Sequence, residues 1–145
     1  MAFKGSVPPV PRLMAIRVGG HSEGGYDRVA LEFDKLPGYS VRYQAKVTYD
    51  GSGEPVELPG HAYLQIVANP AQAHDDAGRS TLAHPPTVPA EVGLPALTSY
   101  VLNGDFEGYV SVALGIAEKS GFRVDQYRTT TGRYVVYVDV ARPLG

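Results

Sequence analysis

Hydrophobic residues along this chain recur at every second position, the pattern of strands that bury one face. In the clearest run, residues 39–49, apolar and polar side chains alternate without a break. Because successive side chains of a strand point to opposite faces, this run predicts a half-buried strand. The same alternation predicts further strands at residues 14–18, 28–34, 62–68, 99–102, 110–116, 122–124 and 134–140.

Residues typical of turns separate these runs and supply the backbone conformations that chain reversals need. About eight short strands with hairpin-like turns favour an antiparallel β-sandwich or a barrel, and we expect an all-β sandwich. The length of 145 residues fits a single domain. The turns fall at residues 19–25, 37–38, 50–53, 59–60, 103–104 and 131–132. Among them, Asn103-Gly104 is predicted to reverse the chain between residues 98–102 and 109–116.

Two segments break the alternation. Residues 1–11 are rich in proline and predict an extended N-terminal arm, so the folded domain is expected to span residues 12–145. Residues 69–96 contain several prolines and no periodicity, which favours a surface crossover between two sheets or, alternatively, a ligand-binding flap. Since residues 72–88 offer little periodic apolar content, their deletion is expected to leave the sandwich folded.

Two strand-like segments resemble each other, because Arg28 to Asp34 and Arg133 to Asp139 both read as arginine, five strand residues and aspartate. Within one segment the two charges lie roughly 20 Å apart at the rise of a strand, so they cannot pair with each other. Ion pairs across neighbouring strands are therefore expected. The alternative is that these charges face a ligand.

Composition narrows the classes of partner. Lysine and arginine number 13 against 15 acidic residues, a net charge of −2 that gives no basic surface for nucleic acid or anionic membranes. There is no cysteine, which excludes disulfides and thiolate chemistry. The apolar runs are short, and Met1 to Pro11 lacks the core of a signal peptide, so the sequence as given is not expected to cross a membrane.

The sequence shows no catalytic or metal-binding motif. The four histidines, His21, His61, His74 and His84, lack the short spacings of zinc sites and are expected to be solvated, and no cofactor is expected. Glu107 is the first carboxylate to consider for glycoside hydrolysis, although a carboxylate bonded to turn amides explains its position equally simply.

Tyrosine is abundant, with ten tyrosines, four phenylalanines and no tryptophan. Tyr63 and Tyr109 fall on the polar phases of their runs and are expected to point outward. An outward tyrosine presents an apolar ring with a polar tip, which suits the recognition of sugars or peptides. Tyrosine is also a common strand residue on any half-buried surface, so both interpretations stay open.

Several motifs, in this order, resemble the AMIN-like domain of bacterial cell-envelope proteins. They are residues 12–20, 25–34, 37–39, 104–108, 110–115, 122–124 and 133–139, with Gly-Asp-Phe-Glu-Gly at 104–108 the most distinctive. The resemblance implies a β-sandwich in a secreted protein or lipoprotein, extracytoplasmic or associated with the envelope. It also implies a non-catalytic module that binds peptidoglycan or another envelope polysaccharide.

On this basis, the candidate ligand contacts are Tyr63 and Tyr109 together with Arg28 and Arg133. Tyrosine stacks on sugar rings, and arginine binds hydroxyl or carboxylate groups with a fixed fork of donors. Two alternatives remain. One is a protein-interaction or dimerisation module that uses an exposed sheet edge and binds an envelope protein. The other is a small carbohydrate-active hydrolase that uses loop carboxylates, and the oligomeric state is left open.

Overall fold

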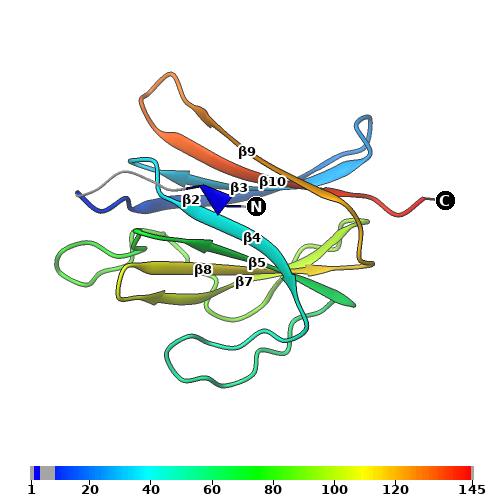
Figure 1. Ribbon diagram of the computed structural model, residues 1–145, viewed down its shortest axis with the longest axis horizontal. Helices are drawn as coiled ribbons and strands as arrows, with labels where there is room; N and C mark the ends of the chain where they lie inside the picture. Colours follow the sequence, from blue (N-terminus) through cyan, green and yellow to red (C-terminus); the bar gives the residue numbers. More distant parts are fainter. Residues whose placement is uncertain (1, 4–8, 145) are drawn as a thin grey trace.

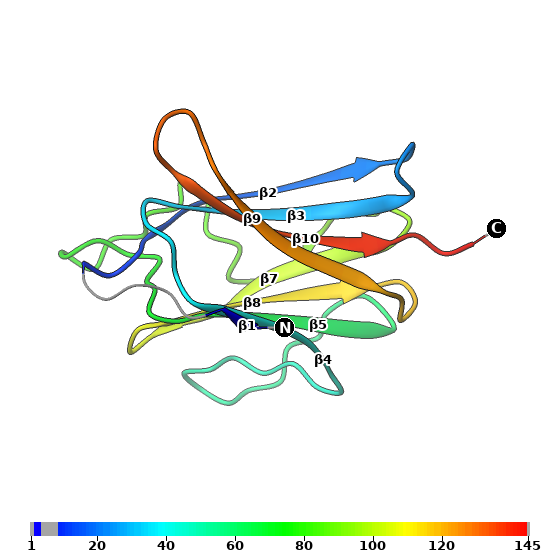
Figure 2. The same ribbon diagram turned by 45° about the horizontal axis from the view of Figure 1, so that its top comes forward.

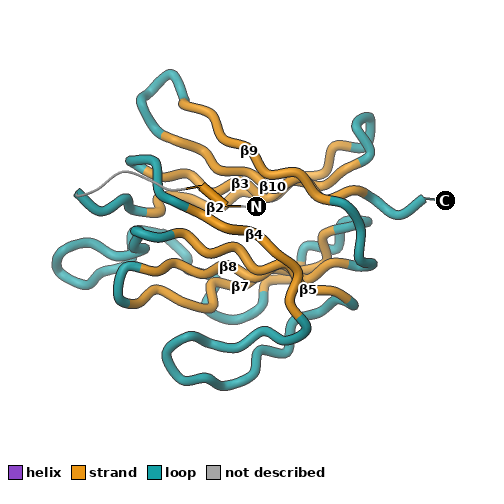
Figure 3. Tube along the Cα trace, in the orientation of Figure 1, coloured by secondary structure: helices purple, strands orange, loops and turns teal. Residues whose placement is uncertain are grey.

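Two antiparallel β-sheets pack face to face in the computed structural model, which describes residues 2–3 and 9–144 (Figure 1). Figure 3 shows only strands and loops in these residues, which confirms the expected all-β sandwich. Each of the eight predicted runs overlaps one strand, and two strands of two residues each add to them. The strands are β1 (Ala2–Phe3), β2 (Leu13–His21), β3 (Tyr26–Phe33), β4 (Tyr39–Gln44), β5 (Ala62–Ala68), β6 (Ala90–Glu91), β7 (Leu97–Phe106), β8 (Tyr109–Ile116), β9 (Phe122–Arg128) and β10 (Tyr134–Ala141).

The smaller sheet has four strands in the order β2-β3-β10-β9. Its central pair joins β3 to β10, with Val29 opposite Val138, although these strands stand near opposite ends of the sequence. The larger sheet has six strands in the order β1-β4-β5-β8-β7-β6. Its outermost strand β1 belongs to the predicted N-terminal arm and pairs with β4; residues 4–8 of that arm lie outside the described part of the chain.

The core lies between the two sheets and is built by the apolar phase of each strand. Val136, which the alternation places in the core, is 1% exposed there. Tyr39 and Tyr43 contribute polar links at the rim, because their hydroxyls donate to Gln126 Oε1 and the Ser120 carbonyl at 2.7 Å each. Burial raises the pKa of Tyr39, with a smaller contribution from the charge of Asp125, so its hydroxyl stays protonated and keeps donating.

The reversal predicted at Asn103-Gly104 lies four residues further along. β7 does pair with β8, as expected, but the hairpin turn is Glu107-Gly108, where both residues have positive φ (51° and 83°), as a two-residue primed turn requires. Asn103 instead lies in an irregularity of the pairing between Leu102 and Gly104. The prediction was wrong because an Asn-Gly pair also suits a bulge within a strand.

Because the turn lies at Glu107-Gly108, valine at Gly108 and valine at Gly104 are expected to differ in their effect on stability. Gly108→Val is expected to lower the free energy of unfolding by about 1–3 kcal/mol, because valine is strained at a φ of 83°. Gly104→Val is also expected to destabilise, but by about 1 kcal/mol, since its Cβ would displace the Asp50 carboxylate from Ser111. Chemical denaturation measures both. Gly51→Val is the control, because a Cβ on Gly51 meets nothing within 4 Å, and a larger loss in it than in Gly108→Val would contradict the assignment.

The strand expected at residues 39–49 ends at Gln44, and residues 45–61 fold over the outer face of the six-stranded sheet. A small hairpin forms around residues 50–53, with Tyr49 and Val56 amides donating to the Glu54 and Val47 carbonyls at 2.9 Å. This hairpin redirects Val47 into a second hydrophobic cluster on the outer side of the sheet. Its buried members are Val47, Leu58, Val101 and Ala113.

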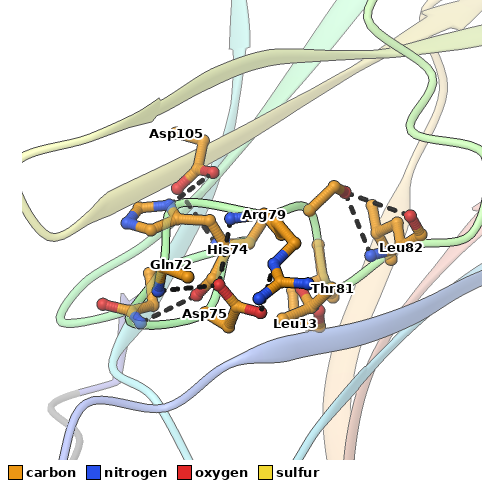
Figure 4. A network of polar contacts seen from close by, with 11 residues as sticks. Leu13, Gln72, His74, Asp75, Arg79, Thr81, Leu82 and Asp105 are labelled. Atoms are coloured by element: carbon orange, nitrogen blue, oxygen red, sulfur yellow. Dashed lines mark hydrogen bonds and ion pairs between the residues drawn. The ribbon is translucent and has the colours of Figure 1, made fainter.

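The long segment 69–96 is part of the core, so the expectation that residues 72–88 are dispensable was wrong. Ala73 and Leu82 are 2% and 7% exposed and pack in the main cluster. Figure 4 shows how polar contacts hold the segment: Gln72 and Leu13 share a backbone hydrogen bond of 2.8 Å, and the Thr81 hydroxyl donates to the Leu13 carbonyl at 2.5 Å. Alanines in a proline-rich segment carry no periodic signal, which explains why the sequence did not indicate burial.

A buried carboxylate ties this segment to the four-stranded sheet. Asp27 is fully buried, and its Oδ2 accepts hydrogen bonds from the amides of Ala96 and Leu97 at 2.6 and 3.1 Å. Its Oδ1 accepts the Arg142 guanidinium at 2.9 Å. One side chain therefore holds the start of β3, the entry to β7 and the exit of β10 together.

Candidate functional site

The outer face of the four-stranded sheet carries charged and aromatic side chains in register across its strands. Arg28 on β3 faces Asp139 on β10 and binds it with two hydrogen bonds, of 2.7 and 3.0 Å. This pair joins the arginine of the first repeated segment to the aspartate of the second, which confirms the expected cross-strand ion pairing. Hydrogen bonding to Asp139 raises the pKa of Arg28, and burial opposes it, so the guanidinium stays charged.

Aromatic rings surround Arg28 on this face. Its guanidinium lies 4.0 Å from the centroid of the Tyr137 ring and 5.5 Å from that of Tyr26. Tyr26 also stacks on His21 at 4.8 Å with an interplanar angle of 13°. Tyr127 lies next to Tyr137, with ring centroids 5.9 Å apart, and is half exposed. We call Tyr26, Arg28, Arg123, Tyr127 and Tyr137 the arginine–tyrosine face.

Arg133 lies apart from Arg28, at the other end of the same sheet. Its guanidinium binds Glu32 at 3.2 Å, and Glu32 also accepts Arg17 at 3.0 Å. Arg28 and Arg133 therefore share an outer face, but each already has a carboxylate partner. Both act first within the sheet, and a ligand would have to compete for their guanidinium groups.

A hollow of about 600 Å³ opens at one end of the arginine–tyrosine face. Its lining comes from three chain segments, residues 24–26 and 121–123 together with Asp139 and Ala141. The charged or aromatic side chains are Tyr26, Phe122, Arg123 and Asp139. Figure 2 shows the start of β9, the end of β10 and the β2–β3 turn at the same end of the molecule. We call it the end hollow.

Arg123 is the accessible cation of the end hollow. Its side chain is 67% exposed, and it reaches Tyr137 Oη at 3.3 Å but Asp139 only at 3.8 Å. Since Arg28 already holds both oxygens of Asp139, most donors of Arg123 remain directed to solvent. The hollow can therefore accept an anionic or hydroxyl-rich group against an aromatic wall.

The two predicted tyrosines lie on the other sheet. Tyr109 at the start of β8 is 50% exposed, as expected for its outward phase. Tyr63 on β5 is half-buried, packs against the second cluster and donates its hydroxyl to the Gly60 carbonyl at 3.3 Å. Tyr63 and Tyr109 therefore do not form one site with Arg28 and Arg133, because the two pairs occupy opposite outer faces of the sandwich.

His21, His61 and His84 are exposed, in line with the expectation of solvated side chains, and three of the four histidines also make specific contacts. His74 Nδ1 lies 2.8 Å from Asp105 Oδ2 (Figure 4), His61 Nδ1 lies 3.0 Å from the Ala117 carbonyl, and His21 stacks on Tyr26. Among the described residues, no three histidine, aspartate or glutamate side chains are grouped as metal ligands would be. Glu107 occupies the β7–β8 turn, on the exposed surface.

The sequence did not indicate Tyr26 and Arg123 as site residues. Each looks ordinary in its own strand, and only the pairing of β10 with both β3 and β9 brings them to one hollow. The repeated arginine–aspartate segments indicated only part of this arrangement, because the ion pairs expected between them are those of β3 and β10. Nothing in the alternation of β9 distinguishes Arg123 from other exposed strand cations.

A comparison with known protein families matches residues 11–142 to the model of the AMIN-like domain. Neither curated protein sequences nor solved structures gave a match. In the part of the chain that the structure describes, no helix is long and apolar enough to span a membrane.

Proposed function

This chain belongs to the AMIN-like domain family, and on that premise we propose that it is a non-catalytic module that binds cell-envelope polysaccharide, such as peptidoglycan, outside the cytoplasm. The family match supports a binding module of the envelope. The end hollow, with Tyr26 and Arg123 on its walls, is the observation that carries the choice of surface.

The charge of the end hollow suits an acidic glycan. Asp139 is neutralised by its two hydrogen bonds to Arg28, which leaves Arg123 as an additional positive charge. Peptidoglycan carries carboxylates on its peptide stems, and a guanidinium fork binds a carboxylate through two parallel hydrogen bonds. A neutral sugar hydroxyl can also accept hydrogen bonds from the Arg123 guanidinium, but these bonds are weaker than those to a carboxylate.

The aromatic rings of the face are held in place before any ligand arrives. Tyr26 stacks on the His21 ring, and the Arg28 guanidinium lies 5.5 Å from the Tyr26 ring centroid and 4.0 Å from that of Tyr137. A ring with a fixed orientation loses little conformational entropy on binding, which favours stacking against a sugar. Tyr127, which is 50% exposed, extends the surface along the sheet.

Arg123→Ala and Tyr26→Ala are each expected to weaken binding to purified peptidoglycan by about 2 kcal/mol, roughly 30-fold, if each side chain is an anchor. Arg133→Ala is expected to cost under about 1 kcal/mol of binding, because its guanidinium already binds Glu32 and does not line the end hollow. Co-sedimentation measures the binding, after circular dichroism shows that each variant is folded.

Arg42→Ala is the matched control, because Arg42 is an exposed strand arginine on the six-stranded sheet. An equal loss for Arg42→Ala and Arg123→Ala would show a general charge effect and contradict the choice of surface. Absence of sedimentation above an inert β-sandwich would contradict glycan binding itself. Release of reducing sugar in the same samples would support the hydrolase alternative.

The alternative of pairing through an exposed sheet edge has less support. The outermost strand β9 carries Arg123, Asp125 and Arg128 along its short length, and such charges discourage the addition of another strand. The opposite edge, β2, carries Arg17, and Gly19 and Gly20 precede its last residue, His21. A concentration-dependent mass in analytical ultracentrifugation would favour this alternative.

A further inference from the structure

A second hollow, of about 230 Å³, lies on the outer face of the six-stranded sheet, away from the end hollow. It lies over β4, β5 and β8 and is bordered by the hairpin of residues 45–61. Figure 1 shows this hairpin on the side of the molecule opposite the four-stranded sheet. We call it the Tyr109 hollow, and its polar and aromatic lining is Gln44, Thr48, Asp50, Gln65, Tyr109 and Ser111.

The floor of the Tyr109 hollow is a fixed polar network. Gln65 and Asn103 exchange two amide hydrogen bonds of 3.1 and 2.9 Å, and both side chains are buried. Asn103 also donates to the Thr48 carbonyl at 2.9 Å, and the Ser111 hydroxyl donates to Asp50 Oδ2 at 2.6 Å. The network therefore holds Asp50 and the hairpin in position over the strands.

Above this floor, several polar groups keep free hydrogen-bonding capacity. Within the described residues, the Gln44 carboxamide, the Thr48 hydroxyl and Asp50 Oδ1 make no hydrogen bond, whereas Asp50 Oδ2 is occupied by Ser111. Tyr109 stands beside them with half of its surface exposed. The hollow thus combines an aromatic ring with both donors and acceptors.

From this geometry we infer that the Tyr109 hollow binds one neutral pyranose ring of a sugar. Its volume lies below the roughly 300 Å³ at which pockets for larger ligands begin, which fits a single ring. The lining contains one carboxylate and no cation, so an anionic group would be repelled, in contrast to the end hollow. The sugar ring would stack on Tyr109, and its hydroxyl groups would donate to Asp50 Oδ1 and exchange hydrogen bonds with the Gln44 carboxamide.

The absence of tryptophan from the sequence provides the test. Tyr109→Trp keeps an aromatic ring at the hollow and makes it the only tryptophan of the protein. Titration with N-acetylglucosamine trimer, cellotriose and maltotriose is expected to give a saturable change of its emission with at least one sugar. The dissociation constant should be on the order of 1 mM, because one ring makes few contacts.

Val88→Trp is the control, since Val88 is 70% exposed and lines neither the Tyr109 hollow nor the end hollow. Adding Gln44→Ala to Tyr109→Trp should weaken binding at least tenfold, because it removes a free amide that holds no other part of the chain. Calorimetric titration of the unmodified protein and of Tyr109→Ala covers the case in which tryptophan does not fit, and Tyr109→Ala should lose the signal. An equal response of Val88→Trp, or no saturable binding by either method, would overturn the proposal.

This inference does not depend on the function proposed above. Arg123→Ala is expected to leave the Tyr109→Trp titration unchanged, because Arg123 lies on the other sheet. If the unmodified protein does not co-sediment with peptidoglycan but the Tyr109→Trp titration is saturable, the result would contradict the role of the end hollow alone. The converse result would contradict the Tyr109 hollow alone.

Discussion

Val136→Asp is expected to unfold the domain. Val136 is 1% exposed at the centre of β10, between the two sheets, and it faces Leu31 of β3 and Gln126 of β9 in the register. An aspartate there would be buried without a partner, at a cost of several kcal/mol against a total stability of about 5–15 kcal/mol. Circular dichroism during thermal denaturation measures the effect as the loss of a cooperative transition.

Val88→Asp is the matched control, because the same change at a valine that is 70% exposed adds a charge without burying it. Its melting temperature should stay within a few degrees of the unmodified protein. A Val136→Asp protein that melts as cooperatively as Val88→Asp would contradict the placement of β10 in the core.

Asp27→Ala is expected to lower the free energy of unfolding by about 3–5 kcal/mol. The substitution leaves the Ala96 and Leu97 amides without their acceptor and the Arg142 guanidinium without its carboxylate. The penalty is large because Asp27 is fully buried, so water cannot replace these bonds. Urea denaturation measures the change in the free energy of unfolding, from a global fit of the transitions of both proteins.

Two variants make this result specific. Asp27→Asn keeps one acceptor oxygen but no charge, so its loss should fall between those of Asp27→Ala and the unmodified protein. Asp125→Ala removes an exposed carboxylate that accepts only the neighbouring Gln126 amide and should change stability by less than about 0.5 kcal/mol. A loss below about 1 kcal/mol in Asp27→Ala would show that Asp27 does not hold the three segments together.

The alternation of polar and apolar residues predicted the strands because burial of one strand face is a local property of the sequence. The repeated segments also predicted that Arg28 would find its partner on another strand, which is Asp139. Local patterns did not show that Ala73 and Leu82 fill the core, since their burial depends on where the two sheets leave space. Likewise, residues 45–49 follow the strand alternation, but a turn at residues 50–53 folds them back over the sheet.

In the candidate sites too, local properties could be predicted from the sequence, whereas contacts between distant segments could not. Tyr109 could be predicted to point outward from its phase alone. The Gln65–Asn103 amide pair below it could not, because residues from β5 and β7 meet only after the six-stranded sheet has formed around β8. The end hollow depends in the same way on three segments that are distant in the sequence.

The central place of β10 determines when the four-stranded sheet can form. In this sheet β3 and β9 are joined only through β10, which is synthesised after the other described strands. Pairing between segments so distant in sequence is slow, and sandwiches of this kind fold in milliseconds to seconds. The β2–β3 hairpin can pair locally, but the four-stranded sheet cannot be completed until residues 134–141 are made.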